Sequence, residues 1–203
     1  KDRADSVEKI AALLYEMVCA RAGNYLAFFP SYSYLEQVRE VFCTAHPEVE
    51  TLRQDTAMDE ASRADFLAQF AAAPGRTLLG FAVLGGLFGE GVDLAGERLI
   101  GAAIVSPGLP QVGPRQEQLR AHFEETRGSG FDYAYRFPGM NKVLQAAGRV
   151  IRTPEDKGVV LLIDDRFLAP DTRRLMPPHW DGLRAVGSAE ELRAELEWFW
   201  NNK

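Results

Sequence analysis

Hydrophobic residues along the chain follow two patterns, helical spacing and short unbroken runs. Near the amino terminus they recur every three or four positions, which predicts an amphipathic helix over 4–22. Residues 25–29 form an unbroken apolar run that ends at Pro30, which predicts a buried strand. By the same patterns we predict further helices after a cap at Ser33 and over 59–73, 115–127, 139–152, 171–176 and 189–200, and further strands over 49–52, 77–84, 99–105, 159–163 and 183–186.

The predicted strands alternate with helices along the chain and are continuously apolar. That combination is typical of a parallel sheet covered on both faces, so we expect a three-layer α/β fold with a mainly parallel sheet. No repeat or internal boundary interrupts it, so residues 1–203 are predicted to form a single domain. Ligands of such sheets bind at the carboxyl ends of the strands. We therefore expect binding residues in the loops after Phe29, Leu84, Val105 and Ile163.

The composition is that of an ordinary globular protein, with 46% hydrophobic and 26% charged residues in 203 positions. It excludes a disordered, collagen-like or coiled-coil chain. No run of about 18 apolar residues occurs, so we expect no membrane-spanning helix. The chain starts at Lys1 instead of a methionine, which a piece of a longer protein and a processed protein would explain equally well, and the absence of a leader-like segment favours the cytoplasm.

Charge and cysteine content narrow the choice of partners. Subtracting 29 acidic from 23 basic residues gives a net charge of −6, which argues against nucleic-acid binding over the whole surface. Residues 139–174 are locally basic, because seven basic and five acidic side chains give +2. Cys19 and Cys43 form no C-x-x-C pair, so we expect two buried or half-buried thiols in a reducing compartment. His46, His122 and His179 lack ligand spacing, and we expect no metal site.

The strongest candidate for chemistry is residues 145–152, which we call the arginine segment. On the predicted helix, Gln145, Arg149 and Arg152 share one face, because they lie at i, i+4 and i+7. The opposite face, predicted to be buried, carries Leu144, Ala147 and Ile151. Gly148 costs a helix about 1 kcal/mol relative to alanine, which indicates close approach of a ligand. Guanidinium groups grip phosphate oxygens, so the segment predicts a phosphate site; the alternative is a solvated helix face.

A second candidate is the loop over 85–93, which has four glycines in nine residues together with Glu90 and Asp93. Glycines allow a backbone to approach a ligand closely, although a flexible turn would look the same.

Two acidic sequences resemble magnesium-binding boxes. Residues 59–62 follow a polar stretch instead of a strand, so we interpret them as a helix cap. Residues 161–165 do follow an apolar run and resemble a Walker B site. No G-x-x-x-x-G-K-[ST] sequence occurs, however, which excludes a complete P-loop nucleotidase within this chain. No G-x-S-x-G elbow occurs either.

Taken in order, several blocks between residues 24 and 167 resemble the second motor domain of the DinG/XPD-like helicases of superfamily two. The block Phe28-Phe29-Pro30-Ser31-Tyr32 is similar to motif IV of that family. The blocks similar to motif V lie at 89–94 and 106–110, and those similar to motif VI and its following strand are Tyr135, Pro138 and residues 145–152, 156–160 and 165–167.

The resemblance implies a RecA-like fold and an ATP site shared by two such domains. The other, amino-terminal domain would carry the Walker A and Walker B residues and would make most of the contacts to ATP and Mg²⁺. In many members of the family that domain also holds an iron–sulfur cluster. In this chain, Arg149 and Arg152 are implied as arginine fingers on the γ-phosphate, and Gln145 as a sensor of either the phosphate or the acidic box of the other domain. The other implied contacts are Glu90, Asp93 and Gly148 with ATP, and Ser31, Tyr32 and Gly89 with single-stranded DNA.

The resemblance further implies an ATP-dependent helicase that moves 5′→3′ on single-stranded DNA in DNA repair, and a chain that is inactive alone. Two other interpretations stay open: a non-catalytic nucleotide- or phosphate-binding module that uses residues 85–93, and a stand-alone hydrolase that uses Asp164 or Asp165. The terminal Trp198-Phe199-Trp200 either packs into the domain's own core or docks onto the other domain.

Overall fold

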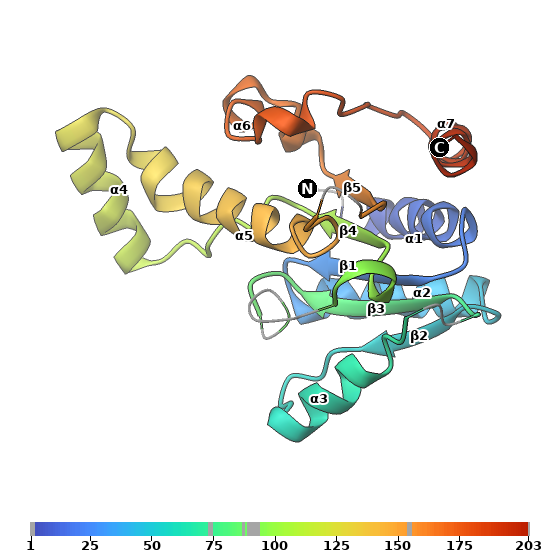
Figure 1. The fold of residues 1–203 in the computed structure, drawn as a ribbon. Coiled ribbons are helices and arrows are strands. Elements are labelled where there is room, and N and C mark those ends of the chain that lie inside the picture. Colours follow the sequence, from blue (N-terminus) through green and yellow to red (C-terminus); the bar gives the residue numbers. More distant parts are fainter. Residues whose placement is uncertain (1–2, 73–74, 87, 89–93, 154–155, 203) are drawn as a thin grey trace.

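A five-stranded parallel sheet forms the centre of the computed structural model, which describes residues 3–72, 75–86, 88, 94–153 and 156–202 (Figure 1). The strands lie in the order β2-β3-β1-β4-β5, and every neighbouring pair is parallel. Their bounds are β1 Asn24–Phe29, β2 Glu50–Arg53, β3 Leu78–Val83, β4 Gly101–Val105 and β5 Val159–Ile163. The predicted α/β fold with a parallel sheet is confirmed.

Alternate side chains of the central strand β1 supply two separate hydrophobic cores. Tyr25, Ala27 and Phe29 belong to the core under α1 (Arg3–Cys19), α2 (Tyr32–Ala45) and α7 (Ala189–Asn201). Leu26 and Phe28 belong to the core on the other face, which α3 (Glu60–Ala68) and α5 (Phe137–Ala147) cover. Because both faces are covered, every residue of β1 is buried, which explains the unbroken apolar run.

Helix α4 (Pro114–Arg127) projects from the layered body (Figure 1), and none of its side chains is buried. It packs against the π-helical turn Asp132–Arg136 that precedes α5. The rings of Phe123 and Tyr133 stack with centroids 4.3 Å apart, and the Tyr135 hydroxyl donates to a Glu117 carboxylate oxygen over 2.6 Å. The shorter elements are the 3₁₀ turns Gly96–Arg98, Asp165–Leu168 and Pro178–Trp180, and helix α6 (Pro170–Arg173).

Three local predictions are wrong. The cap of α2 is Ser31 instead of Ser33, because the Ser31 hydroxyl accepts from the Tyr34 N–H over 3.3 Å and starts the helix two residues earlier. Residues 183–186 form no strand; the segment passes β5 without pairing, and Val186 is apolar because it packs against the core. Cys19 is exposed, and Cys43 is half-buried as predicted.

The two tryptophans at the end of α7 differ in burial, so packing into the domain's own core, one of the two interpretations of this segment, applies to one of them only. Trp200 packs against the core of its own domain, with the guanidinium of Arg21 4.6 Å from its ring centroid. Trp198 is 57% exposed. The reading as a core-facing helix therefore holds for Trp200 and not for Trp198. Among the helices that the structure describes, none is both long enough and apolar enough to cross a bilayer.

Candidate functional site

Helix α5 runs from the carboxyl ends of the strands, which we call the carboxyl edge of the sheet, back to their amino ends, the amino edge. Its direction therefore determines where the arginine segment lies. At its start, a Cβ added to Gly139 would lie 2.5 Å from the carbonyl oxygen of Pro107, which follows β4. Beyond its end, Val150 contacts Gly158, and Gly158 precedes β5. The arginine segment therefore lies at the amino ends of β4 and β5. The prediction that binding residues gather at the carboxyl ends of the strands does not hold for this segment.

The predicted helix over 139–152 ends early, at Ala147. After Gly148 the backbone hydrogen bonds change from the α-helical i→i−4 pattern to the i→i−3 pattern of a 3₁₀ turn. The N–H of Arg149 donates to the carbonyl of Ala146 over 3.2 Å, and that of Val150 donates to the carbonyl of Ala147 over 3.1 Å. Gln145 therefore stands on the last helical turn, Arg149 on the tighter turn and Arg152 beyond both. The prediction that these three side chains share one helical face is wrong.

The carboxylate of Asp156 fixes the backbone around Arg152. Its Oδ2 accepts the N–H groups of Arg152 and Thr153, each over 2.9 Å. These two backbone hydrogen bonds hold the pKa of Asp156 below its ordinary value, because they favour the charged carboxylate. The turn is thus held through its main chain, and the Arg152 side chain takes no part in these two bonds.

Burial separates the two sides of the arginine segment. Gln145, Gly148 and Arg152 are exposed and Arg149 is half-buried, which gives a polar, cationic surface. Ala147 and Val150 are buried on the other side. Ile151, predicted to be buried, is 49% exposed because the chain has already left the helix there. The arrangement presents Arg152 at the surface and Arg149 half-buried beside it, with the Arg149 Nε buried, and cationic side chains so placed suit binding of an anion such as phosphate.

A buried polar cluster lies at the opposite, carboxyl edge of the sheet. Gln54, just after β2, is 1% exposed. Its Nε2 donates to the hydroxyl of Tyr32 over 2.9 Å, and its Oε1 accepts from the N–H of Val83 over 2.8 Å. Gln54 is not among the predicted site residues. Its signal in the sequence is a glutamine two positions after the predicted strand over 49–52, where a polar residue marks the carboxyl end of the strand.

Two further described residues, Ser31 and Lys142, lie at the carboxyl edge. Ser31, predicted to contact DNA, uses its hydroxyl to cap α2, so its side chain already has a structural role. Lys142 of α5 lies over Gly85, where an added Cβ would be 2.8 Å from Lys142 Cδ and 3.3 Å from its Nζ. An aromatic ring, a buried amide and a lysine thus lie along one edge. Aromatic rings and cations are the groups that bind the bases and phosphates of a single strand.

Gly89, Glu90 and Asp93, predicted to contact DNA or nucleotide, lie outside the described residues. Only the flanks of their loop are placed. Phe88 is buried and packs on Phe66 with ring centroids 4.4 Å apart, and Leu94 is also buried.

The acidic sequences that resemble magnesium boxes have structural roles. Asp59 caps α3 by accepting the Ser62 N–H over 2.8 Å, which confirms the predicted helix cap. Asp164 caps the turn Asp165–Leu168 and pairs with the Arg166 guanidinium over 2.7 Å. Partial burial acts to raise the pKa of Asp164, but the hydrogen bonds from Arg166 outweigh it and hold that pKa below its ordinary value. In the parts of the chain that are described, no three His, Cys, Asp or Glu side chains gather around a possible metal ion.

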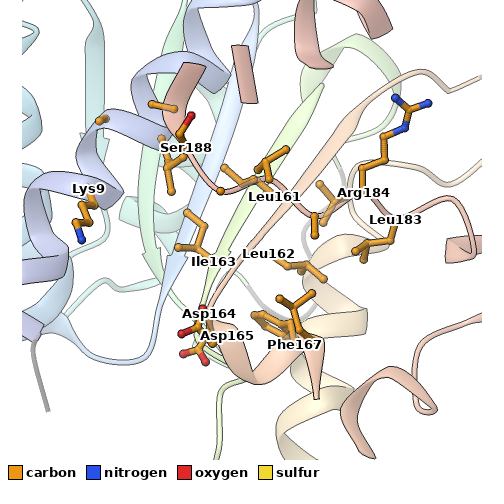
Figure 2. Close-up of a pocket in the computed structure, with 18 residues that line it drawn as sticks. Lys9, Leu161, Leu162, Ile163, Asp164, Asp165, Phe167, Leu183, Arg184 and Ser188 are labelled. Atoms are coloured by element: carbon orange, nitrogen blue, oxygen red, sulfur yellow. The ribbon is translucent and has the colours of Figure 1, made fainter. Parts of the chain in front are cut away.

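A cavity of about 490 Å³ lies between β5, α1 and residues 183–189 (Figure 2). Its walls are mainly apolar, with Leu161, Ile163 and Leu183 among them, and Asp164 and Asp165 lie at one end. Lys9 and Arg184 also line the cavity, and Asp164 is paired with Arg166 over 2.7 Å. With mainly apolar walls and one of its two carboxylates already paired, the cavity gives no support to the alternative of a stand-alone hydrolase.

Comparison with known proteins gives consistent matches over most of the chain. The helicase C-terminal domain family matches residues 14–182. The ATP-dependent DNA helicase YoaA of Escherichia coli (strain K12) is 30% identical over 166 residues, which cover 80% of this chain and 24% of YoaA. The general transcription and DNA repair factor IIH helicase subunit XPD of Dictyostelium discoideum is 28% identical over 183 residues, covering 84% of this chain and 23% of that subunit. The chain spans about a quarter of the length of these two relatives.

Solved structures support the same fold. One named "XPD_APO" has a TM-score of 0.67 at 18% identity, covering 86% of this chain and 34% of its own. Another, "XPD_Helicase", has a TM-score of 0.65 at 20% identity, covering 86% of this chain and 30% of its own. The RecA-like fold and the resemblance to an XPD-like carboxyl-terminal motor domain are thereby confirmed, and the chain belongs to the helicase C-terminal domain family.

Proposed function

We propose that this chain is the second motor domain of an ATP-dependent DNA helicase. In this proposal it completes an ATP site together with an amino-terminal RecA-like domain of the same protein. The family match and the helicase relatives support the class of protein. The observation that carries the nucleotide role is the arginine segment, in which Arg149 stands on the tight turn after α5 and Arg152 follows at a backbone that Asp156 fixes, both at the amino ends of β4 and β5.

The proposed chemistry follows from charge. In phosphoryl transfer, charge develops on the oxygens of the transferring group, and a guanidinium stabilises it without covalent chemistry. Arg149 and Arg152 would supply that charge as arginine fingers, and Gln145 would bind the γ-phosphate as an amide donor. Gly148 is exposed and has no Cβ, so ATP could approach this part of the backbone closely, although the Gly148 N–H already donates to the carbonyl of Leu144 over 2.9 Å.

Mg²⁺, when bound with ATP, neutralises phosphate charge. The described residues of this chain offer it no ligand cluster, so we assign its binding to the amino-terminal domain. ATP would draw the two domains together because both bind the same phosphates, and hydrolysis would release them. Many members of the resembled family carry an iron–sulfur cluster in the amino-terminal domain, and this chain leaves open whether its own protein has one; a cytoplasmic location stays a prediction from the sequence.

We further propose that single-stranded DNA passes over the carboxyl edge, where Tyr32 and Lys142 lie, and that the intact protein moves 5′→3′. The half-buried ring of Tyr32 suits stacking on a base, and Lys142 suits contact with a phosphate. Ser31 and Gly89 belong to the same proposed track. Since the chain carries a net charge of −6, we expect weak DNA binding by this domain alone.

The substitution Arg152→Ala in the intact protein tests the nucleotide role. Loss of an arginine finger costs roughly 10³-fold or more in turnover. We therefore expect ATP turnover to fall by at least about 100-fold, with ATP binding by the same variant within about threefold of wild type. Arg115→Ala, at an exposed arginine on the projecting α4, is the matched control and keeps full turnover. Normal turnover in Arg152→Ala would contradict the proposal.

A further inference from the structure

We infer that Gln54 is a positioning residue for single-stranded DNA binding, which acts by holding Tyr32 and the end of β3 in one fixed arrangement. The inference rests on the proposed DNA track at the carboxyl edge. Nothing in the family match or in the sequence motifs points to Gln54; its contacts in the fold do.

The side-chain amide of Gln54 joins two separate segments. Its Nε2 donates to the Tyr32 hydroxyl over 2.9 Å, and its Oε1 accepts the N–H of Val83 over 2.8 Å. Its own backbone N–H donates to the carbonyl of Phe81 over 2.8 Å, which anchors Gln54 itself to β3. With Gln54 only 1% exposed, these bonds replace water that the amide has lost.

The first of these bonds fixes the orientation of Tyr32. Because the hydroxyl accepts from Gln54, its own hydrogen is available to the carbonyl of Asp55, which lies 3.4 Å away. One residue earlier, the Ser31 cap fixes the backbone where α2 begins. The ring is thus held at both ends, by the cap at its backbone and by Gln54 at its hydroxyl. Pre-ordering an aromatic side chain lowers the entropy that it loses on binding a base.

The second bond brings the described start of the glycine-rich loop, Gly85 and Gly86, to the same point. Val83 is the last residue of β3, and residues 85–93 follow it. A Cβ added to Gly86 would lie 3.3 Å from Gln54 Nε2 and 3.1 Å from the carbonyl oxygen of Val83. The amide therefore contacts the start of this loop and also holds Tyr32. Displacing it would shift both parts of the proposed track together.

The location of Gln54 separates its effect from that of the arginine segment. The segment lies at the amino ends of β4 and β5, whereas Gln54 lies beyond the carboxyl end of β2. A loss of positioning at Gln54 should raise the DNA concentration that the enzyme needs and leave the KM for ATP unchanged. A general loss of structure would change both quantities.

The test uses the intact protein with the variants Gln54→Leu, Tyr32→Phe, their double variant and Tyr32→Ala. The readouts are the oligo-dT concentration for half-maximal ATPase stimulation and the KM for ATP. We expect Gln54→Leu to raise the oligo-dT requirement about tenfold and Tyr32→Phe about threefold, with KM for ATP unchanged. The double variant should match Gln54→Leu, because both substitutions remove the same hydrogen bond. Gln37→Leu, at an exposed glutamine of α2, is the matched control.

Each other outcome overturns the inference in a distinguishable way. Additive effects in the double variant, or a parallel rise in KM for ATP, would show that Gln54 does not act through Tyr32. If the oligo-dT concentration for half-maximal stimulation is unchanged in Gln54→Leu but raised in Tyr32→Ala, the positioning role of Gln54 is wrong and the proposed DNA track through Tyr32 is supported. A normal requirement in Tyr32→Ala would remove both. If Gln54→Leu fails to fold, Tyr32→Phe breaks the same bond from its other side, and an unchanged requirement there decides against the inference.

Discussion

The amino and carboxyl edges of this sheet hold their polar groups in different ways. At the amino edge, the arginine segment is fixed through its backbone, because Asp156 binds the N–H groups of Arg152 and Thr153. At the carboxyl edge, Gln54 fixes a side chain directly by its bond to the Tyr32 hydroxyl. The amino edge therefore holds a cationic segment by its main chain, while the carboxyl edge restrains an aromatic ring by its hydroxyl. The two proposed activities, at phosphate and at DNA, should therefore be separable by substitution.

The largest effect among the tests of this comparison is expected from Gly158→Ala, at the amino edge. An added Cβ would collide with Val150 and lie 2.9 Å from the carbonyl oxygen of Ile100. Overpacking of this kind costs about 1–3 kcal/mol, so the free energy of unfolding should fall by that amount in urea denaturation of the chain. Gly182→Ala, where nothing lies within 4 Å of the added Cβ, should change it by less than about 0.5 kcal/mol. Equal midpoints for both variants would contradict the packing of Val150 under the arginine segment.

A smaller effect is expected from Lys142→Ala, at the carboxyl edge. Loss of one phosphate contact should weaken oligo-dT binding by the intact protein several-fold and reduce the salt slope of binding by about one. ATP binding should stay unchanged, because Lys142 lies on the opposite edge from the arginine segment. Fluorescence anisotropy over a salt series measures both quantities, with Lys9→Ala on α1 as the exposed-lysine control. An unchanged salt slope would exclude Lys142 from the DNA track.

A still smaller effect is expected from Asp156→Asn. The pKa of Asp156 is lowered in the folded chain, so its stabilisation is present above the ordinary pKa of about 4 and is lost as the pH falls through the folded value. Wild type should therefore have a higher Tm than the variant at pH 7, and the difference should shrink below about pH 4. Thermal unfolding between pH 7 and 3 measures it, with Asp181→Asn as an exposed control. A difference that is constant with pH would exclude the carboxylate as the cause.

The smallest effect concerns ATP and the chain alone. If the amino-terminal domain supplies most of the ATP site, isothermal titration calorimetry of the isolated chain with ATP should give no micromolar binding, and the chain should show no ATPase activity. Micromolar binding would favour the alternative of a phosphate-binding module that uses residues 85–93.

Some elements could be predicted from the sequence because their causes are local. The run over 25–29 forms five of the six residues of β1, because the side chains of a strand covered on both faces are buried whichever way they point. Asp59 caps α3 because its side chain reaches an N–H only three residues away. The end of α5 was mispredicted because apolar and polar residues keep helical spacing through Arg152, although the backbone hydrogen bonds already change to the i→i−3 pattern at Arg149.

From the sequence alone followed the alternation of the five parallel strands with helices, the residue types of the arginine segment and the family that they resemble; the strand over 183–186 did not form. The order of elements also predicts where that segment lies, because a helix that connects two parallel strands runs antiparallel to them and ends at their amino edge. The general rule that ligands bind at the carboxyl ends of the strands gave the wrong location for it. Only the tertiary structure decided that Gln54 contacts Tyr32 and Val83. Those residues meet because β3 lies between β2 and β1, and such an order depends on packing between distant segments that no local pattern records.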